Sequence, residues 1–244
     1  MTQYREFVSR EIRYAADGTE MIGRLIVPKG GGLRPAVLIA HESNGLSPHA
    51  IGSAERLAAL GYVAFAHDYF GGGKLPGLEV AQATMRGWGA DPAGIRLRAQ
   101  AALDVLTAES GVDPARVAAV GYCYGGTAMM ELGRTGAALA AIVGLHPGLK
   151  SPRPEDSARI RGAVLMCVGS ADPIAPPDQR LAFEREMSAA GVDWRMIVYG
   201  GVAHSFTNPD IGKLGWDGFA YDAAADARSR RAMLDLLEET IGLP

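Results

Sequence analysis

A cysteine stands in the middle of a glycine-flanked turn, where its thiol could act as a nucleophile. Residues 116–133 read RVAAVGYCYGGTAMMELG, and the stretch from Gly121 to Gly125 is G-x-C-x-G. This is the G-x-S-x-G pattern with sulfur in place of oxygen, in which a sharp strand-to-helix turn pushes the central side chain out above a sheet. The helix start favours the thiolate of Cys123, and the free N–H of Tyr124 is positioned to bind an oxyanion. The alternative is a buried structural cysteine, because G-x-C-x-G alone is a weak pattern.

A nucleophile needs a base, and the base needs a group that orients it. With a turn of this kind the chain order is nucleophile, acid, histidine. Asp172 in GSADPIAPP and His204 in GVAHSF each follow an apolar run, in the required order. Either residue alone could be an ordinary loop residue, but together with the turn they predict a Cys123–His204–Asp172 triad. Three other histidines precede the turn, and His146 in GLHPG is expected to line the pocket.

Glu42 ends the first buried run of the chain, in IAHESNGL. A carboxylate at this place would face the thiol across the mouth of the site. The loop after such a strand supplies the second oxyanion donor, so the N–H of Ser43 is the candidate. A zinc-binding H-E-x-x-H motif is excluded because the second histidine would fall on Gly45. The alternative for Glu42 is a solvated loop glutamate.

Strand and helix patterns alternate around these residues. A hairpin is predicted to turn at Asp17–Gly18. Buried strands are predicted over 35–42, 138–147 and 162–173, and further strands over 62–70 and 194–201, besides the strand before the cysteine. Helices are predicted from Ser47–Pro48 to Gly61, from Asp91–Pro92 to Gly111, and over 177–191 and 225–242. The alternation predicts a mostly parallel sheet with an N-terminal antiparallel hairpin and helices on both faces, in one domain over 1–244. Segments 71–90, 148–162 and 207–221 lack periodicity, and such loops at the carboxyl ends of strands build the site.

Composition excludes several classes of protein. The 244 residues carry a net charge of −3, which gives no electrostatic reason to expect nucleic acid or an anionic membrane as partner. Residues 1–18 have no apolar region of a signal peptide, and no stretch approaches the length of a membrane span. Two cysteines in apolar runs are not a disulfide framework, so a reducing cytoplasm is the expected compartment.

Four short motifs together resemble those of the dienelactone hydrolase family of α/β-hydrolases: GYCYGG, GSADPIAP, AHSF and HESNG. The resemblance runs from about residue 23 to about residue 237. It implies an α/β-hydrolase fold and a thiol that rests protonated or paired with Glu42. It further implies that substrate binding swings Glu42, which takes the proton so that the thiolate attacks. A thiolate suits activated acyl groups such as enol-lactones and thioesters.

One departure from the family concerns substrate charge. Where dienelactone hydrolase has an arginine that grips the substrate carboxylate, this chain has Asn208, in HSFTNPD. Arg86 is the nearest match to a second family arginine, although it could equally face solvent, and Lys213 is another possible replacement cation. We therefore expect a neutral substrate rather than dienelactone. An apolar, aromatic pocket is expected from residues that could also be core, namely Phe70, Trp88, Tyr124, His146 and Phe206.

These features predict an enzyme that hydrolyses a small-molecule ester or lactone without a cofactor or metal, as a monomer or small homo-oligomer. A thioesterase or acyltransferase using the same residues is the first alternative. A non-catalytic binding module that keeps the fold and the pocket is the second, and intact nucleophile, acid and base count against it.

Overall fold

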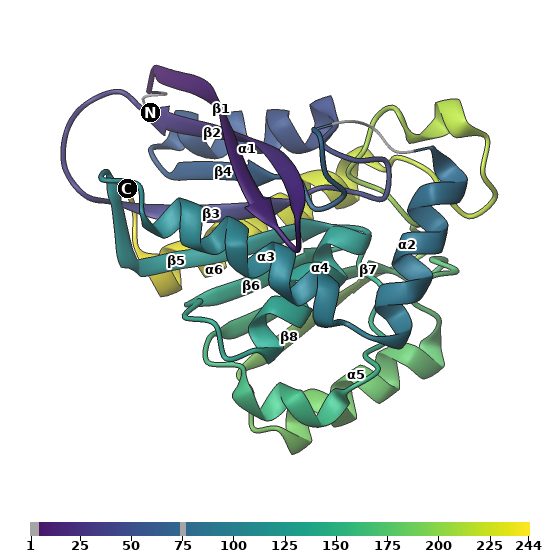
Figure 1. The fold of residues 1–244 in the computed structure, drawn as a ribbon. Helices are drawn as coiled ribbons and strands as arrows, with labels where there is room; N and C mark the ends of the chain where they lie inside the picture. The colour runs from purple at the N-terminus through teal and green to yellow at the C-terminus, as the bar shows by residue number, and fades with distance from the viewer. Residues whose placement is uncertain (1–4, 74–76) are drawn as a thin grey trace.

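The computed structural model describes residues 5–73 and 77–244, which form one eight-stranded sheet between layers of helices (Figure 1). The strand order is β1-β2-β4-β3-β5-β6-β7-β8. Strands β1 (Phe7–Ala16) and β2 (Thr19–Pro28) are the antiparallel hairpin, and β2 is also antiparallel to β4. The hairpin turns at Asp17 and Gly18, which both have positive φ, as a tight two-residue hairpin loop requires.

The other strand pairs are all parallel and carry the buried runs of the sequence. They join β3 (Arg34–Ala40), β4 (Val63–His67), β5 (Val112–Tyr122), β6 (Ala141–Leu145), β7 (Ala163–Gly169) and β8 (Trp194–Tyr199). Every residue of β3, β4 and β6 is buried, as expected for strands covered on both faces.

Two layers of helices cover the sheet. Helices α1 (Pro48–Leu60) and α6 (Ala223–Ile241) pack on one face, while α3 (Ala93–Thr107), α4 (Tyr124–Arg134) and α5 (Pro177–Ala189) pack on the other. The predicted architecture, a mostly parallel sheet with an N-terminal antiparallel hairpin and helices on both faces, is confirmed.

The prediction of an aperiodic segment over 71–90 is wrong for its second half. Residues Leu78–Ala90 form helix α2, which stands at one edge of the molecule in Figure 1. Only Ala81 of this helix is buried, so it has no apolar stripe from which a helix could be predicted. Residues 74–76 of that segment lie outside the described residues, as do residues 1–4 of the N-terminal stretch. The other two segments contain the short 3₁₀ helices η1 (Pro154–Arg159) and η2 (Ile211–Leu214).

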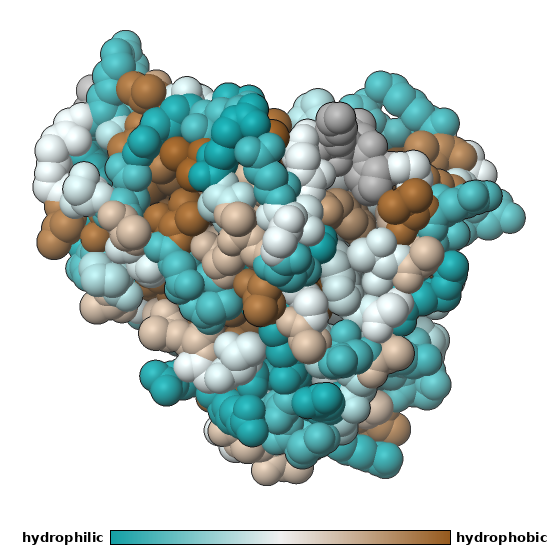
Figure 2. Space-filling model, in the orientation of Figure 1, coloured by the Kyte–Doolittle hydropathy of each residue, from teal (hydrophilic) through white to brown (hydrophobic). Residues whose placement is uncertain are grey.

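The surface is mixed in polarity. On the face shown in Figure 2, apolar residues form separate patches among polar ones. Among the helices of the described residues, none combines the length and apolarity needed to cross a membrane.

Candidate active site

Strand β5 runs directly into helix α4, and Cys123 is the residue between them. Its backbone has φ 52° and ψ −122°, a strained conformation for a residue with a side chain. The two flanking glycines are needed for steric reasons. A Cβ on Gly121 would lie 2.2 Å from the carbonyl oxygen of Gly125, and a Cβ on Gly125 would lie 2.4 Å from the carbonyl oxygens of Ala40 and His41. The thiol is thereby held at the amino end of α4 above the sheet.

His204 and Asp172 lie next to this thiol. The Nε2 atom of His204 is 3.1 Å from Sγ of Cys123, and Nδ1 is 2.8 Å from Oδ2 of Asp172. The ring of His204 is buried against Phe219, and Oδ1 of Asp172 accepts a hydrogen bond from the N–H of Ile174 at 2.7 Å. Burial alone lowers the pKa of His204, but the charge of Cys123 and the hydrogen bond to Asp172 outweigh it and raise the pKa to about 10.

Two backbone N–H groups border the thiol. Tyr124 is the first residue of α4, and Ser43, in the loop after β3, lines the same cavity as Cys123. Within the described residues, neither N–H donates a hydrogen bond to another protein group. Both are therefore available to an oxygen atom bound beside the sulfur.

Glu42 is buried, with 4% of its surface exposed, so it is not a solvated loop residue. Its Oε2 accepts a hydrogen bond from Nδ2 of Asn208 at 2.6 Å and lies 3.5 Å from Nδ1 of His49. The resemblance implied a resting contact between Glu42 and the thiol. Among the described residues, no hydrogen bond joins them, because Asn208 holds the carboxylate while His204 lies against Cys123.

A cavity of about 580 Å³ opens at Cys123. Of the residues suggested by the sequence, it is lined by Ser43, Arg86, Cys123, Tyr124 and His204. Sequence reasoning missed the rest of the wall: Leu78, Gln82 and Met85 on α2, Thr127 on α4, and Gly148, Ile174, Trp216 and Phe219 in loops. The sequence gives no clear signal for the α2 part of the wall, because Ala81 is the one buried residue of that helix.

The other residues expected in the pocket lie elsewhere. Trp88 stacks on Tyr124 with ring centroids 6.1 Å apart and lines an adjoining cavity of about 230 Å³. Phe70 stacks behind Trp88, and Phe206 is fully buried against Tyr199. Phe70 and Phe206 therefore support the site by packing, whereas Trp88 lies beside the main cavity.

Two polar residues also support the site rather than line the cavity. His146 is fully buried, and its Nδ1 accepts a hydrogen bond from the N–H of Cys123 at 3.1 Å. Burial and the neighbouring His204 keep the pKa of His146 well below its ordinary value, so the ring is a neutral acceptor. Asn208 is held on Glu42, as described above. Lys213 pairs with Asp210 at 2.6 Å and is absent from the cavity wall.

The second cysteine is chemically inert by comparison. Cys167 is fully buried in β7, and burial raises the pKa of its thiol to about 12. Among the residues described, no group of three or more His, Cys, Asp or Glu side chains could hold a metal ion.

A mostly parallel sheet with a cysteine at a strained strand–turn–helix junction, and with an acid and a histidine after later strands, is the arrangement of an α/β-hydrolase. Residues 21–241 match the dienelactone hydrolase family, so the chain belongs to that family. It is a hydrolase that acts on carboxylic ester or lactone bonds.

Similar proteins have the same fold over nearly their whole length. The dienelactone hydrolase-like promiscuous phosphotriesterase P91, from metagenomic libraries, is 41% identical, with 97% of this chain and 99% of that one covered and a TM-score of 0.93. A structure named m3DLH is 43% identical, with 96% and 99% covered and a TM-score of 0.93. A putative carboxymethylenebutenolidase of Aquifex aeolicus is 25% identical over 81% of this chain and 86% of its own.

Proposed function

We propose that this enzyme cleaves a neutral ester or lactone by covalent catalysis at Cys123. The observation that carries the proposal is the line of three side chains: the thiol 3.1 Å from His204, and His204 2.8 Å from Asp172, at a strained turn that opens into a cavity. The raised pKa of His204, about 10, supports the role of its imidazole as the acceptor of the thiol proton.

The proposed reaction has two half-reactions. Sulfur of Cys123 attacks the carbonyl carbon, and the N–H groups of Tyr124 and Ser43 hold the oxyanion. His204 gives its proton to the leaving alkoxide, and the acyl group remains on sulfur as a thioester. Water then attacks the carbonyl carbon of this thioester while His204 takes a proton from the water. The carbon–sulfur bond breaks, the acid leaves, and His204 returns the proton to the sulfur, which restores the thiol.

Glu42 has an assisting role in this proposal. Its carboxylate is a second acceptor for the thiol proton, available when it leaves Asn208. General-base assistance of this kind is typically worth about 10²–10⁴ in rate. The dominant role stays with His204, because that imidazole is the group in contact with the sulfur.

The choice of a neutral substrate rests on the cavity wall. Among the described residues that line it, Arg86 is the one lysine or arginine, and apart from His204 the others are apolar or uncharged. A thioesterase or acyltransferase would use the same acyl-enzyme with a different donor or acceptor, so both remain alternatives.

The experiment is a screen of aryl esters, lactones and acyl-CoA thioesters, as substrates of the wild-type protein, with Cys123→Ala as the blank. We expect the wild-type protein to turn over neutral esters or lactones and Cys123→Ala to be inactive. Cys167→Ala is the matched cysteine control and should keep full activity. Preference for acyl-CoA would favour the thioesterase alternative. Activity that survives in Cys123→Ala and is lost in a folded Cys167→Ala would contradict the assignment of the nucleophile.

A second candidate activity is the hydrolysis of phosphotriesters. It is favoured by the 41% identity to a promiscuous phosphotriesterase and by the apolar wall of the cavity, which suits an uncharged triester. The same screen tests it with an aryl dialkyl phosphate. We expect slow release of the aryl alcohol that disappears in Cys123→Ala, and no release above the blank would remove this candidate.

A further inference from the structure

The peptide group between Glu42 and Ser43 carries the second proposed oxyanion donor on one side and a carbonyl group on the other. The N–H of Ser43 and the carbonyl of Glu42 belong to one planar unit. In a trans peptide the two point in opposite directions, and none of the described residues has a cis peptide bond. Whatever fixes the carbonyl oxygen of Glu42 therefore also fixes the direction of the N–H of Ser43.

Three donors converge on this carbonyl oxygen. Nδ1 of His41 lies 2.6 Å away, the hydroxyl of Tyr69 lies 3.0 Å away, and the N–H of Gly45 lies 3.2 Å away. The same hydroxyl lies 2.9 Å from the carbonyl oxygen of His41, so its one proton bridges two consecutive peptide groups. On the opposite side, Ser43 lines the cavity at Cys123, and its N–H donates to no protein group in the described part of the chain.

The contacts of His41 and Tyr69 also fix where their protons lie. A carbonyl oxygen can only accept, so Nδ1 of His41 carries the proton of a neutral ring. Nε2 is then an acceptor, and the N–H of Tyr69 lies 3.5 Å from it. Burial lowers the pKa of His41 to about 4 and raises the pKa of Tyr69 well above its ordinary value. At pH 7 both side chains are therefore neutral donors.

Both donors are held rigidly. His41 and Tyr69 are fully buried, and their rings stack with centroids 3.7 Å apart. Tyr69 lies just after β4, where the buried carboxylate of Asp68 accepts hydrogen bonds from the N–H groups of Phe70 at 2.9 Å and Gly73 at 2.7 Å. The hydroxyl of Tyr69 is thus presented from a fixed turn of the backbone.

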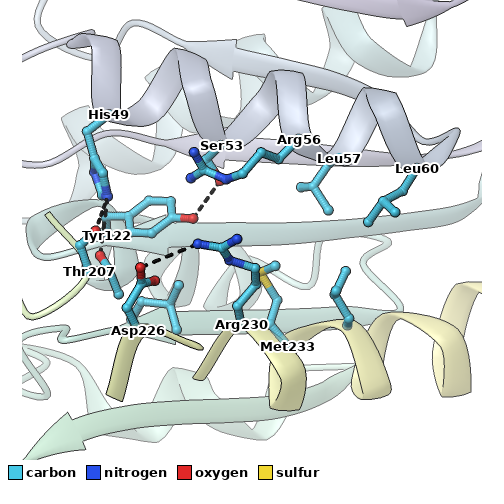
Figure 3. Close-up of a pocket in the computed structure, with 12 residues that line it drawn as sticks. His49, Ser53, Arg56, Leu57, Leu60, Tyr122, Thr207, Asp226, Arg230 and Met233 are labelled. Atoms are coloured by element: carbon cyan, nitrogen blue, oxygen red, sulfur yellow. Dashed lines mark hydrogen bonds and ion pairs between the residues drawn. The ribbon is translucent and has the colours of Figure 1, made fainter. Parts of the chain in front are cut away.

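The loop after β3 is also fixed at its far end, where it enters α1. Figure 3 shows His49 of α1 beside Thr207, whose carbonyl oxygen lies 3.0 Å from Nε2 of His49. The cavity drawn there between α1 and α6 measures about 30 Å³, enough for about one water molecule, so it is not a second substrate site. The peptide group of Ser43 therefore lies in a loop that is held on both sides.

We propose that Tyr69 and His41 are positioning residues for the oxyanion donor. They hold the Glu42–Ser43 peptide group so that its N–H points at the oxygen atom on which charge develops when Cys123 attacks. The inference rests on the proposed function, which assigns the N–H of Ser43 to the oxyanion. A donor that is fixed beforehand stabilises the charge without reorganisation, and hydrogen bonds to the carbonyl polarise the peptide group, which strengthens its N–H as a donor.

The first test observes the peptide group directly and needs no activity. The ¹⁵N–H signal of Ser43 is compared in the wild-type protein, Tyr69→Phe and Tyr14→Phe. We expect the nitrogen signal to move to lower chemical shift in Tyr69→Phe, because a carbonyl that loses a hydrogen bond polarises its N–H less. Tyr14→Phe is the matched control, since it removes a hydroxyl that donates to the carbonyl oxygen of Asp68 at 2.8 Å and should leave Ser43 unchanged. An unchanged Ser43 signal in Tyr69→Phe would overturn the proposal.

The second test separates oxyanion binding from the reactivity of the thiol, and it includes a second position in case Tyr69→Phe folds poorly. We expect kcat/KM on a neutral aryl ester to fall roughly tenfold or more in Tyr69→Phe and in His41→Leu. Alkylation of Cys123 by iodoacetamide forms no oxyanion, so its rate should stay within about twofold of the wild-type rate.

His41→Asn is the conservative variant at the second position. Its amide keeps an N–H donor near the place of Nδ1, so it should recover most of the activity that His41→Leu loses. Equal losses in His41→Asn and His41→Leu, or a parallel fall in the alkylation rate, would contradict the proposed role. If the wild-type protein turns over no ester, the proposed function fails, while the Ser43 signal still decides whether these side chains set its peptide group.

Discussion

At the scale of single residues, charge is concentrated on one histidine. His204 contacts both the thiol of Cys123 and the carboxylate of Asp172 in a buried position, and its pKa rises to about 10 from an ordinary 6.5. The other histidines around the site are shifted in the opposite direction, because burial lowers the pKa of His146 and of His49. The imidazole that touches the sulfur is thus also the one that holds a proton most firmly.

This shift predicts how stability depends on pH. A group whose pKa rises on folding stabilises the folded state fully below its ordinary pKa, and this contribution disappears as pH rises through the folded-state value. The contribution of His204 should therefore be full below pH 6.5 and lost by about pH 10. Urea unfolding of wild-type protein and His204→Gln at several pH values measures it. We expect the difference in free energy of unfolding to change in favour of the variant as pH rises, and the opposite trend would show that the pKa is not raised.

At the scale of elements, the turn between β5 and α4 depends on backbone contact with the end of β3. Gly125 of α4 packs against the carbonyl groups of Ala40 and His41, which leaves no space for a side chain. The same contact brings the loop that carries Ser43 to the thiol. Close packing of two backbones thus assembles the candidate oxyanion site.

Gly125→Ala tests this contact. The added Cβ would lie 2.4 Å from two backbone oxygens that cannot move aside, so we expect a loss of stability of roughly 1–3 kcal/mol and slower turnover. Gly87→Ala in α2 is the matched control, because nothing lies within 4 Å of its added Cβ. Chemical denaturation compares the two variants. Equal stability of both would mean that the approach of α4 to β3 is looser than described.

Helix α2 carries the cation that faces the substrate cavity. With Asn208 held by Glu42 and Lys213 paired with Asp210, Arg86 is the one lysine or arginine among the described lining residues. Arg86 is exposed, so its charge is screened by solvent. We expect neutral esters to be turned over at least as well as carboxylate-bearing dienelactones. A clearly higher kcat/KM for a dienelactone than for its methyl ester would refute this expectation. Loss of that preference in Arg86→Gln would show that Arg86 on α2 causes it.

The sequence was sufficient to predict the site residues that directly follow strands. Cys123, Asp172 and His204 each follow a parallel strand, and parallel strands bring their carboxyl ends to one edge of the sheet. The orientation of Glu42 could not be predicted, because its partner Asn208 is 166 residues away and lies in an irregular loop. The same holds for the contact between His49 and Thr207, which are 158 residues apart. Helix α2 was missed because its one buried residue gives no periodic pattern.

At the scale of the whole molecule, a buried charge network joins the helices behind the site. Arg134 of α4 is 1% exposed and donates to Glu131 at 2.9 Å and to Glu186 of α5 at 2.6 Å. Ser157 of η1 accepts from Arg134 at 2.9 Å. The network lies at the end of α4 opposite Cys123, so it anchors the helix that presents this thiol.

Arg134→Met should therefore destabilise the whole fold. It leaves Glu186 without its cation and Glu131 with Arg96 alone, and breaking one side of a buried pair costs about 3–5 kcal/mol. The control is Arg195→Met, which breaks an exposed, solvent-screened pair with Glu239 and should change stability little. Thermal unfolding, with residual activity measured below the transition, compares the variants. A loss for Arg134→Met no larger than for Arg195→Met would argue against an anchoring role.

The measurement that tests the central claim most directly is the capture of the acyl-enzyme. Protein mixed with a neutral aryl ester is quenched in acid within the first turnovers, and the mass of the intact protein and of its peptides is determined. We predict one added acyl group on the peptide that contains Cys123, present in Cys167→Ala and absent in Cys123→Ala. Steady turnover by an enzyme that never carries an acyl group on Cys123 would contradict the account.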